Sequence, residues 1–289
     1  MVIIMDKTLM NKFTHILEMT EKKKDDSLES HILLDDSLKR IKKYLYDIRI
    51  DEYEEKSKDD KKSVLEYDKQ FFKENLPLQK IIVFGKDDIA FKTNPFKIIE
   101  FRSGLDTSYV DFFKILSGKY RGQIGFDGIV MQDKITKLSY GQLGHEIVHT
   151  QIEKNPNSLE SFYNREVISM FIELVISESL DKSILDNMMR ERFKNVNECL
   201  VYLSYYEDCI YTYDEISKFR CYLSSALKAL HLYSVYQTSN KYRRIEILSL
   251  VEDIFRNRIT VEEFLNRMHV TYDNSKDYEL VKTYVKKYR

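Results

Sequence analysis

Apolar residues recur at intervals of three and four along most of the chain, which is the period of an amphipathic helix. In the first 50 residues this pattern predicts two helices, and a shorter helix is predicted at 64–76. All 8 glycines lie between Gly85 and Gly144, so the second half must consist of helices joined by turns without glycine. The predicted helices of this second half lie at 139–154, 158–180, 183–206, 213–237, 241–257 and 260–268.

Two of these helices begin with a sequence that is typical of a capping box. Ser139-x-x-Gln142 would cap the first helix of the second half, and Thr260-x-x-Glu263 would cap the last one. In each case we expect the hydroxyl oxygen to accept a hydrogen bond from a backbone N–H of the first turn.

The middle of the chain has a different pattern, with short runs of β-branched and other apolar residues. Such runs at 79–85 and 95–102 are bounded by proline and glycine and predict two strands. Residues 106–116 suit another helix, and the glycine-rich segment 122–131 predicts a third strand that another backbone can approach closely. The sequence therefore predicts a mainly α fold of the α+β class, with a small sheet beside the helix at 139–154.

A charged run at 51–62 contains both signs of charge and almost no apolar residue. This pattern indicates an exposed connection or a solvated helix end. We therefore expect an N-terminal helical region at 1–62 and a second domain at 63–289.

Composition and charge narrow the class of function. Lys and Arg number 46 against 47 Asp and Glu, so the net charge of -1 provides no basic field for nucleic acid or for an acidic membrane. No stretch reaches the roughly 18 apolar residues of a membrane span, and the apolar N-terminus is too short for a signal peptide. Cys199, Cys209 and Cys221 form no CxxC pair, which fits reduced thiols and predicts a cytoplasmic protein.

The most specific motif is HEIVH at 145–149, an HExxH pattern inside the predicted helix 139–154. Imidazoles at positions i and i+4 lie on one helical face, so His145 and His149 can share one tetrahedral zinc ion. Glu146 would project beside that ion, where a metallopeptidase needs its general base. The motif therefore predicts one zinc per chain.

A third ligand can be located by counting from the turn at Pro156. The two histidines stand eleven and seven residues before this proline, so an antiparallel helix reaches their level seven to eleven residues after it. Glu166 stands ten residues after the proline, whereas Glu160 lies too near the turn and Glu173 about two turns too far. Two histidines and Glu166 would leave the fourth position to water, as in a catalytic zinc site.

Glu173 follows Glu166 by seven residues, which is nearly two full turns, so both face the same way. A metal-bound imidazole usually donates its other N–H to a carboxylate or a carbonyl. Glu173 is a candidate to accept this hydrogen bond from His145, and a surface charge is the alternative.

The pattern E-V-x-S-x-F-x-E at 166–173, after the HExxH motif, resembles the thimet oligopeptidase and oligoendopeptidase F family of gluzincins. The resemblance extends from about residue 79 onward and implies a zincin-like fold and peptide-bond hydrolysis. It also implies that the strand at 125–131 binds a peptide substrate along its edge. The segment 219–226 resembles the family helix whose tyrosine stabilises the tetrahedral intermediate, with Tyr222 as the best match. Tyr233 and Tyr236 share a stripe with it and stay alternatives.

The mechanism implied by this resemblance uses zinc to polarise the scissile carbonyl and to acidify its water. Glu146 would take the proton from that water, and a tyrosine hydroxyl would support the oxyanion. The expected function is a cytoplasmic zinc-dependent oligopeptidase or endopeptidase that acts on peptides or unfolded proteins. A dedicated enzyme for one protein or leader peptide differs from it only in substrate range.

One departure from the family leaves an alternative of another class. No histidine occurs between His149 and His231, so the family's glycine-rich, histidine-bearing substrate loop is missing. A degenerate relative would keep the fold and serve as a binding or regulatory protein. The sequence does not choose the oligomeric state.

Overall fold

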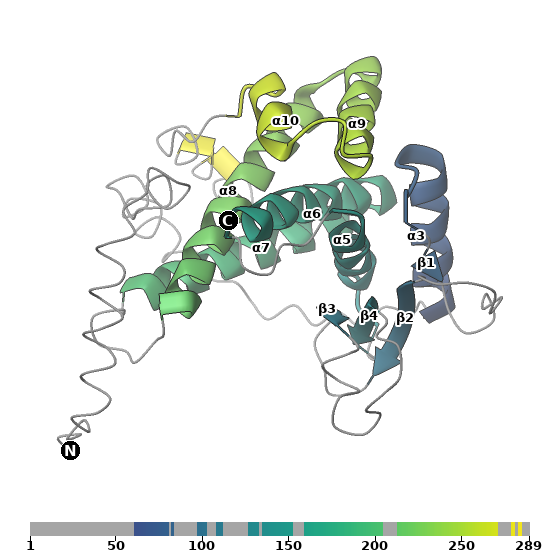
Figure 1. Ribbon diagram of the computed structural model, residues 1–289, viewed down its shortest axis with the longest axis horizontal. Helices are drawn as coiled ribbons and strands as arrows, with labels where there is room; N and C mark the ends of the chain where they lie inside the picture. The colour runs from purple at the N-terminus through teal and green to yellow at the C-terminus, as the bar shows by residue number, and fades with distance from the viewer. Residues whose placement is uncertain are drawn as a thin grey trace.

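The computed structural model describes two long helical stretches and several shorter segments of the chain (Figure 1). The predicted helices of the first 50 residues, most of the charged run at 51–62 and the turn at Pro156 lie outside the described residues. The division at residue 62 therefore stays a prediction. The described residues are 61–80, 82–83, 97–102, 108–111, 127–132, 135–152, 159–204, 213–270, 279–280 and 283–284.

The described residues are mainly helical, which confirms the predicted class at this level. The ends of these helices agree with the predicted positions to within about three residues. The amphipathic period and the scarcity of glycine limit where a helix can begin and end. Among the described helices, none combines the length and the apolar character that crossing a membrane requires. The helices are α3 (Lys61–Asn75), α5 (Ser139–Gln151), α6 (Leu159–Leu180), α7 (Lys182–Ser204), α8 (Tyr213–Thr238), α9 (Lys241–Phe255) and the short α10 (Val261–Arg267).

The two predicted capping boxes have different outcomes. Thr260 Oγ1 accepts a hydrogen bond from the Glu263 N–H at 3.1 Å, and Glu263 Oε2 accepts one from the Thr260 N–H at 2.7 Å, so this box is confirmed. The box at Ser139 is wrong, because Leu138 is the N-cap of α5 and makes no side-chain cap. Ser139 Oγ instead accepts the N–H of Thr136 at 2.9 Å, in the turn before the helix.

The strands are β1 (Ile82–Val83), β2 (Lys97–Arg102), β3 (Ser108–Asp111) and β4 (Asp127–Gln132), in the order β1-β2-β4-β3. The β1–β2 and β2–β4 pairs are parallel, and β3 is antiparallel to β4. The helix predicted at 106–116 is therefore wrong over β3. The sequence Ser-Tyr-Val-Asp contains aromatic and β-branched residues, and pairing with β4 outweighs the helical period of this segment.

The position of β4 inside the sheet corrects a second expectation. Residues 128–130 pair with β2 on one side and with β3 on the other. A strand that is paired on both sides has no free backbone groups for a third. The implied edge-on binding of substrate by the strand at 125–131 is therefore wrong for residues 128–130, and among the described strands β3 is the outer one on this side.

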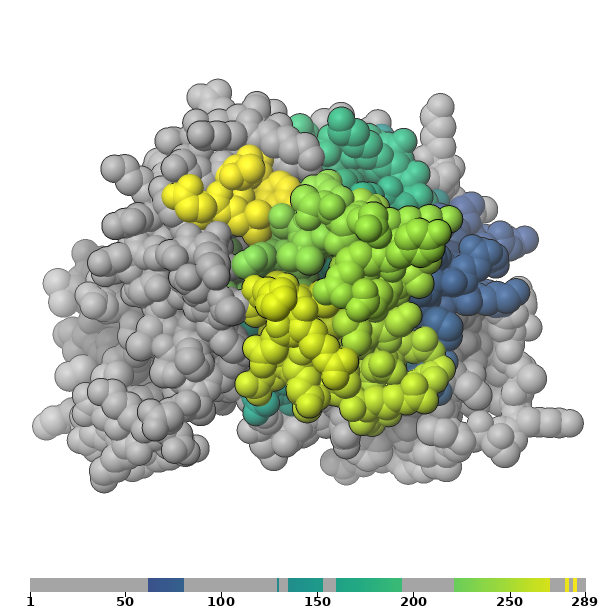
Figure 2. Space-filling model, turned by 90° about the horizontal axis from the view of Figure 1, so that it is seen from above, coloured from purple at the N-terminus to yellow at the C-terminus, as the bar shows by residue number. Residues whose placement is uncertain are grey.

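Helix α6 runs through the middle of the helical part and packs against α5, α7 and α8 (Figure 1). Helix α5 also contacts α3, β3 and β4. A Cβ atom added at Gly144 would lie 2.1 Å from Ile176 Cδ1, so glycine here allows α5 and α6 to approach closely. Helices α9 and α10 lie side by side on the face shown in Figure 2.

Candidate metal centre

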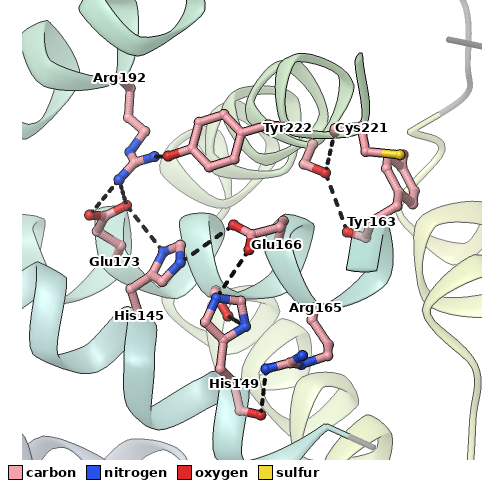
Figure 3. A network of polar contacts seen from close by, with 11 residues as sticks. His145, His149, Tyr163, Arg165, Glu166, Glu173, Arg192, Cys221 and Tyr222 are labelled. Atoms are coloured by element: carbon pink, nitrogen blue, oxygen red, sulfur yellow. Dashed lines mark hydrogen bonds and ion pairs between the residues drawn. The ribbon is translucent and has the colours of Figure 1, made fainter. Parts of the chain in front are cut away.

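The hairpin of α5 and α6 brings two histidines and one glutamate together (Figure 3). His145 Nε2 lies 3.5 Å from Glu166 Oε2, and His149 Nε2 lies 3.3 Å from Glu166 Oε1. All three side chains are buried, with 6 to 7% of each residue exposed. The structure thus brings Glu166 to the level of the two histidines, as the count from the turn predicts.

The spacing of these atoms suits a small cation. Ligand atoms about 2.0–2.1 Å from a tetrahedral zinc ion stand roughly 3.3 Å apart from one another. The two nitrogen–oxygen distances in the cluster are 3.5 and 3.3 Å, and the three ligand atoms all lie within 4.8 Å of one another. Within the described ranges, no other group of three His, Cys, Asp or Glu side chains has this arrangement. His145, His149 and Glu166 could therefore hold a metal ion.

The ring of His149 is oriented by helix α6. Ser169 Oγ lies 3.2 Å from His149 Nδ1, within hydrogen-bond distance, and Arg165 Nη2 donates to the His149 backbone oxygen at 3.4 Å. A hydrogen bond at Nδ1 fixes which nitrogen faces the cluster. Ser169 therefore directs Nε2 of His149 toward Glu166.

The ring of His145 has a carboxylate on its other side. Glu173 Oε2 lies 3.7 Å from His145 Nδ1, and Glu173 is fully buried. The alternative of a surface charge at Glu173 is therefore wrong. Its place behind the imidazole is the one in which an outer carboxylate orients a metal ligand.

Arg192 on α7 is a member of the site that the sequence does not reveal (Figure 3). Its Nη2 donates to Glu173 Oε1 at 2.8 Å and lies 2.7 Å from Oε2, and its Nη1 donates to Tyr222 Oη at 2.8 Å. Arg192 itself is 6% exposed. No motif or spacing marks this arginine, and only the packing of α7 on α6 and α8 reveals its partners.

Tyr222 on α8 is the tyrosine that the structure joins to this network. Its hydroxyl is linked to Arg192, and through Arg192 to Glu173. Tyr236 instead packs against Phe171, with ring centroids 5.9 Å apart. The hydroxyl of Tyr233 accepts a hydrogen bond from Gln237 at 3.5 Å. The geometry thus favours Tyr222 over the two alternatives.

Charges within the cluster oppose the effect of burial. Burial would lower the pKa of His145, but the carboxylates of Glu166 and Glu173 raise it to about 10. Burial lowers the pKa of His149 to about 4, although Glu166 acts in the opposite direction. Burial would raise the pKa of Glu166, and the two histidines lower it instead. A metal ion that binds here would therefore displace a proton from His145.

Two further groups complete the site. Glu146 is 9% exposed and lies close enough to His145 for its charge to contribute to the raised pKa of that histidine. Burial raises the pKa of Tyr222 to about 12, although Arg192 acts to lower it. The Tyr222 hydroxyl therefore keeps its proton at neutral pH and can donate it in a hydrogen bond.

No known protein family, characterised protein or solved structure matches this chain. The resemblance to the thimet oligopeptidase and oligoendopeptidase F family therefore rests on the motif residues alone.

Proposed function

We propose that this chain is a cytoplasmic zinc-dependent metallopeptidase with a zincin-like fold. The observation that carries the proposal is the placement of both histidine Nε2 atoms at 3.5 and 3.3 Å from the two oxygens of Glu166. His145, His149 and Glu166 would hold one zinc ion, and the intervening Glu146 of the HExxH motif would stand beside it. This donor set leaves one position open, which is the arrangement of catalytic rather than structural zinc sites.

A bound zinc ion would supply Lewis-acid chemistry, which acidifies a water molecule and polarises the scissile carbonyl. Glu146 accepts the proton of that water and then delivers it to the leaving amine nitrogen. Tyr222 donates its hydroxyl proton in a hydrogen bond to the developing oxyanion. Burial of the cluster excludes bulk water, which strengthens these electrostatic interactions.

A peptide or an unfolded segment is the substrate class that fits this fold. The outer strand β3 contacts α5, the helix that carries both histidines. An extended peptide can add to such an edge by backbone hydrogen bonds, which place its scissile bond without regard to side chains. A general oligopeptidase and a dedicated processing enzyme share this mode of binding.

A second candidate function is a zincin-fold binding or regulatory protein that retains the metal without turnover. The observation in its favour is that the sequence holds no histidine between His149 and His231, where the family has its substrate loop. Zinc retention without hydrolysis of any peptide in a library would identify this function.

The test of the proposed function is Glu146→Gln, with the exposed Glu262→Gln on α10 as the matched control. Loss of the general base should lower peptide hydrolysis by about 100- to 10,000-fold, and the zinc content should not change because Glu146 is not a ligand. The control should behave as the unmodified chain does. Undiminished hydrolysis by the Glu146→Gln variant would refute the mechanism.

A further inference from the structure

Arg192 connects two parts of the site that lie on different helices. One end of its guanidinium group faces Glu173 on α6, at 2.8 and 2.7 Å from the two carboxylate oxygens. The other end reaches Tyr222 on α8 at 2.8 Å. Figure 3 shows the tyrosine ring extending from α8 to meet the arginine on the side of the cluster where Glu173 and His145 lie.

The direction of the Arg192–Tyr222 hydrogen bond follows from chemistry. A guanidinium group has N–H donors and no acceptor, so the tyrosine oxygen must accept this bond. The Tyr222 O–H group does not donate in this hydrogen bond, so its proton is available to another acceptor. A positive charge beside the oxygen also makes the hydroxyl a stronger donor, because it stabilises the negative charge that the oxygen gains on donation.

We propose that Arg192 is a positioning residue that holds Tyr222 with its proton available to the oxyanion. This role rests on the proposed peptidase function and assigns a task to a residue outside the zinc-binding motif. Glu173 holds the guanidinium Nη2 by a hydrogen bond to Oε1 and an ion-pair contact at Oε2, and Nη1 of the same group holds the phenol. The same group thus connects the carboxylate behind His145 with the oxyanion-supporting hydroxyl.

An arginine is needed here because its donors form a rigid planar fork. Its Nη2 donates to the carboxylate and its Nη1 donates to the phenol, so two nitrogens of one rigid plane hold the two partners. A lysine has a flexible stem and a single nitrogen, so it keeps the charge beside Glu173 without holding Tyr222. Arg192→Lys therefore separates the position of Tyr222 from the charge balance of the site.

The experiment compares Arg192→Lys, Tyr222→Phe and the double variant as full-length, zinc-loaded protein. Two quantities are measured by calorimetry: the affinity for zinc, and the affinity for a phosphinic analogue of the peptide that the wild-type chain cleaves best. A phosphinate oxygen occupies the place of the oxyanion, so its binding reports the Tyr222 hydrogen bond without any turnover. Arg190→Lys, on the same helix and partly exposed, is the matched control.

The proposal predicts that Arg192→Lys and Tyr222→Phe each weaken phosphinic peptide binding by about 10- to 100-fold, the range for a hydrogen bond to a charged group. The double variant should be no weaker than Tyr222→Phe, because the arginine acts through the tyrosine. In hydrolysis assays the loss should fall on kcat rather than on KM. The affinity for zinc should change less than the affinity for the phosphinic peptide, since neither residue is a ligand and lysine keeps the charge beside Glu173.

Independent effects that add in the double variant would overturn the positioning role and leave the peptidase function intact. Unchanged phosphinic peptide binding in Arg192→Lys would do the same. Should Arg192→Lys fail to fold, Arg192→Met combined with Glu173→Gln replaces it, because this pair leaves no buried charge unpaired. The same loss of phosphinic peptide binding as in Tyr222→Phe is then expected, and unchanged binding would overturn the positioning role. A wild-type chain that holds zinc but cleaves no peptide would instead overturn the proposed function, and the role of Arg192 with it.

Discussion

Two buried carboxylates, Glu173 on α6 and Asp68 on α3, differ in what surrounds them. Both residues have no exposed surface. Glu173 faces Arg192 and His145, and although burial would raise its pKa, these cations lower it. Among the described residues, neither oxygen of Asp68 has a hydrogen-bond partner, and burial raises the pKa of this carboxyl well above its ordinary value.

The difference shows that burial without a cation raises the pKa of an acid, and that neighbouring cations lower it. The region between α5 and α8 provides such cations, so a charged carboxylate is available behind the candidate metal ligand His145. Helix α3 provides aromatic packing instead, because Phe71 and Phe72 are buried on the same helix as Asp68. Charge is therefore concentrated where the chemistry would need it, and α3 contributes to stability.

The largest change in stability is expected from Arg192→Met, which leaves Glu173 buried and without its main cation. Removal of one partner from a buried ion pair costs about 3–5 kcal/mol, and we expect this loss in the free energy of unfolding measured with urea. The added change Glu173→Gln should recover part of it, because no buried charge is then left unpaired. If Arg192→Met lowers the free energy of unfolding no more than the partly exposed control Arg190→Met does, Arg192 and Glu173 do not form a buried ion pair in the folded chain.

The next largest effect is expected from Glu166→Ala, which removes one of the three candidate ligands. Loss of an outer partner of a metal ligand costs about 10- to 100-fold in metal affinity, and loss of a ligand itself should cost more. Zinc affinity measured by competition with a chelator should show this decrease. The exposed Glu160→Ala on the same helix is the control and should bind zinc as the unmodified chain does. Equal affinities in the two variants would exclude Glu166 as a ligand.

A pH-dependent effect is expected from Asp68→Asn. Because the folded-state pKa lies above the ordinary value of 3.8, the folded chain binds this proton more tightly than the unfolded chain. The stability from this proton is complete below pH 3.8 and is lost as the pH rises toward the folded pKa, by about 1.4 kcal/mol for each pH unit. Asparagine cannot ionise, so the variant should gain in melting temperature over the wild type between pH 5 and pH 7.

The control for this pH series is Asp253→Asn, whose carboxylate is partly exposed and paired with Arg258. Its difference from the wild type should be small at every pH, because exposed ion pairs contribute about 0–1 kcal/mol. A constant difference between Asp68→Asn and the wild type across the series would mean that Asp68 is already charged in the folded chain.

The smallest effect is expected from Tyr67→Phe, which tests the structural role of α3. The hydroxyls of Tyr67 and Ser179 lie 2.7 Å apart and join α3 to α6. Loss of one such bond should cost about 1 kcal/mol in the free energy of unfolding. Zinc affinity should not change, and a loss of zinc in this variant would show that α3 contributes to the metal centre.

The sequence predicts the parts of this molecule that depend on local pattern. The helices from α5 onward follow from the apolar period, and the place of Glu166 follows from counting residues on both sides of one proline. Local sequence pattern does not predict the structure of segments whose conformation depends on contacts with another part of the chain. Ser139 bonds to the preceding turn instead of capping α5, and β3 is a strand because β4 lies beside it.

Arg192 and Asp68 lie beyond sequence reasoning for a related reason. Both are charged residues in amphipathic helices, where most charged side chains are solvated. The burial of Arg192 depends on how α7 crosses α6 and α8, and that of Asp68 depends on how α3 lies against α5. Crossing geometry is set by side chains from several helices together, so no spacing along one helix reveals it.

The zinc content of the chain, purified without added metal and measured by elemental analysis against protein concentration, tests the central claim most directly. The proposed centre at His145, His149 and Glu166 predicts one zinc per chain, and a much lower content in Glu166→Ala than in Glu160→Ala. No bound metal, even after zinc is offered to the folded protein, would contradict the account.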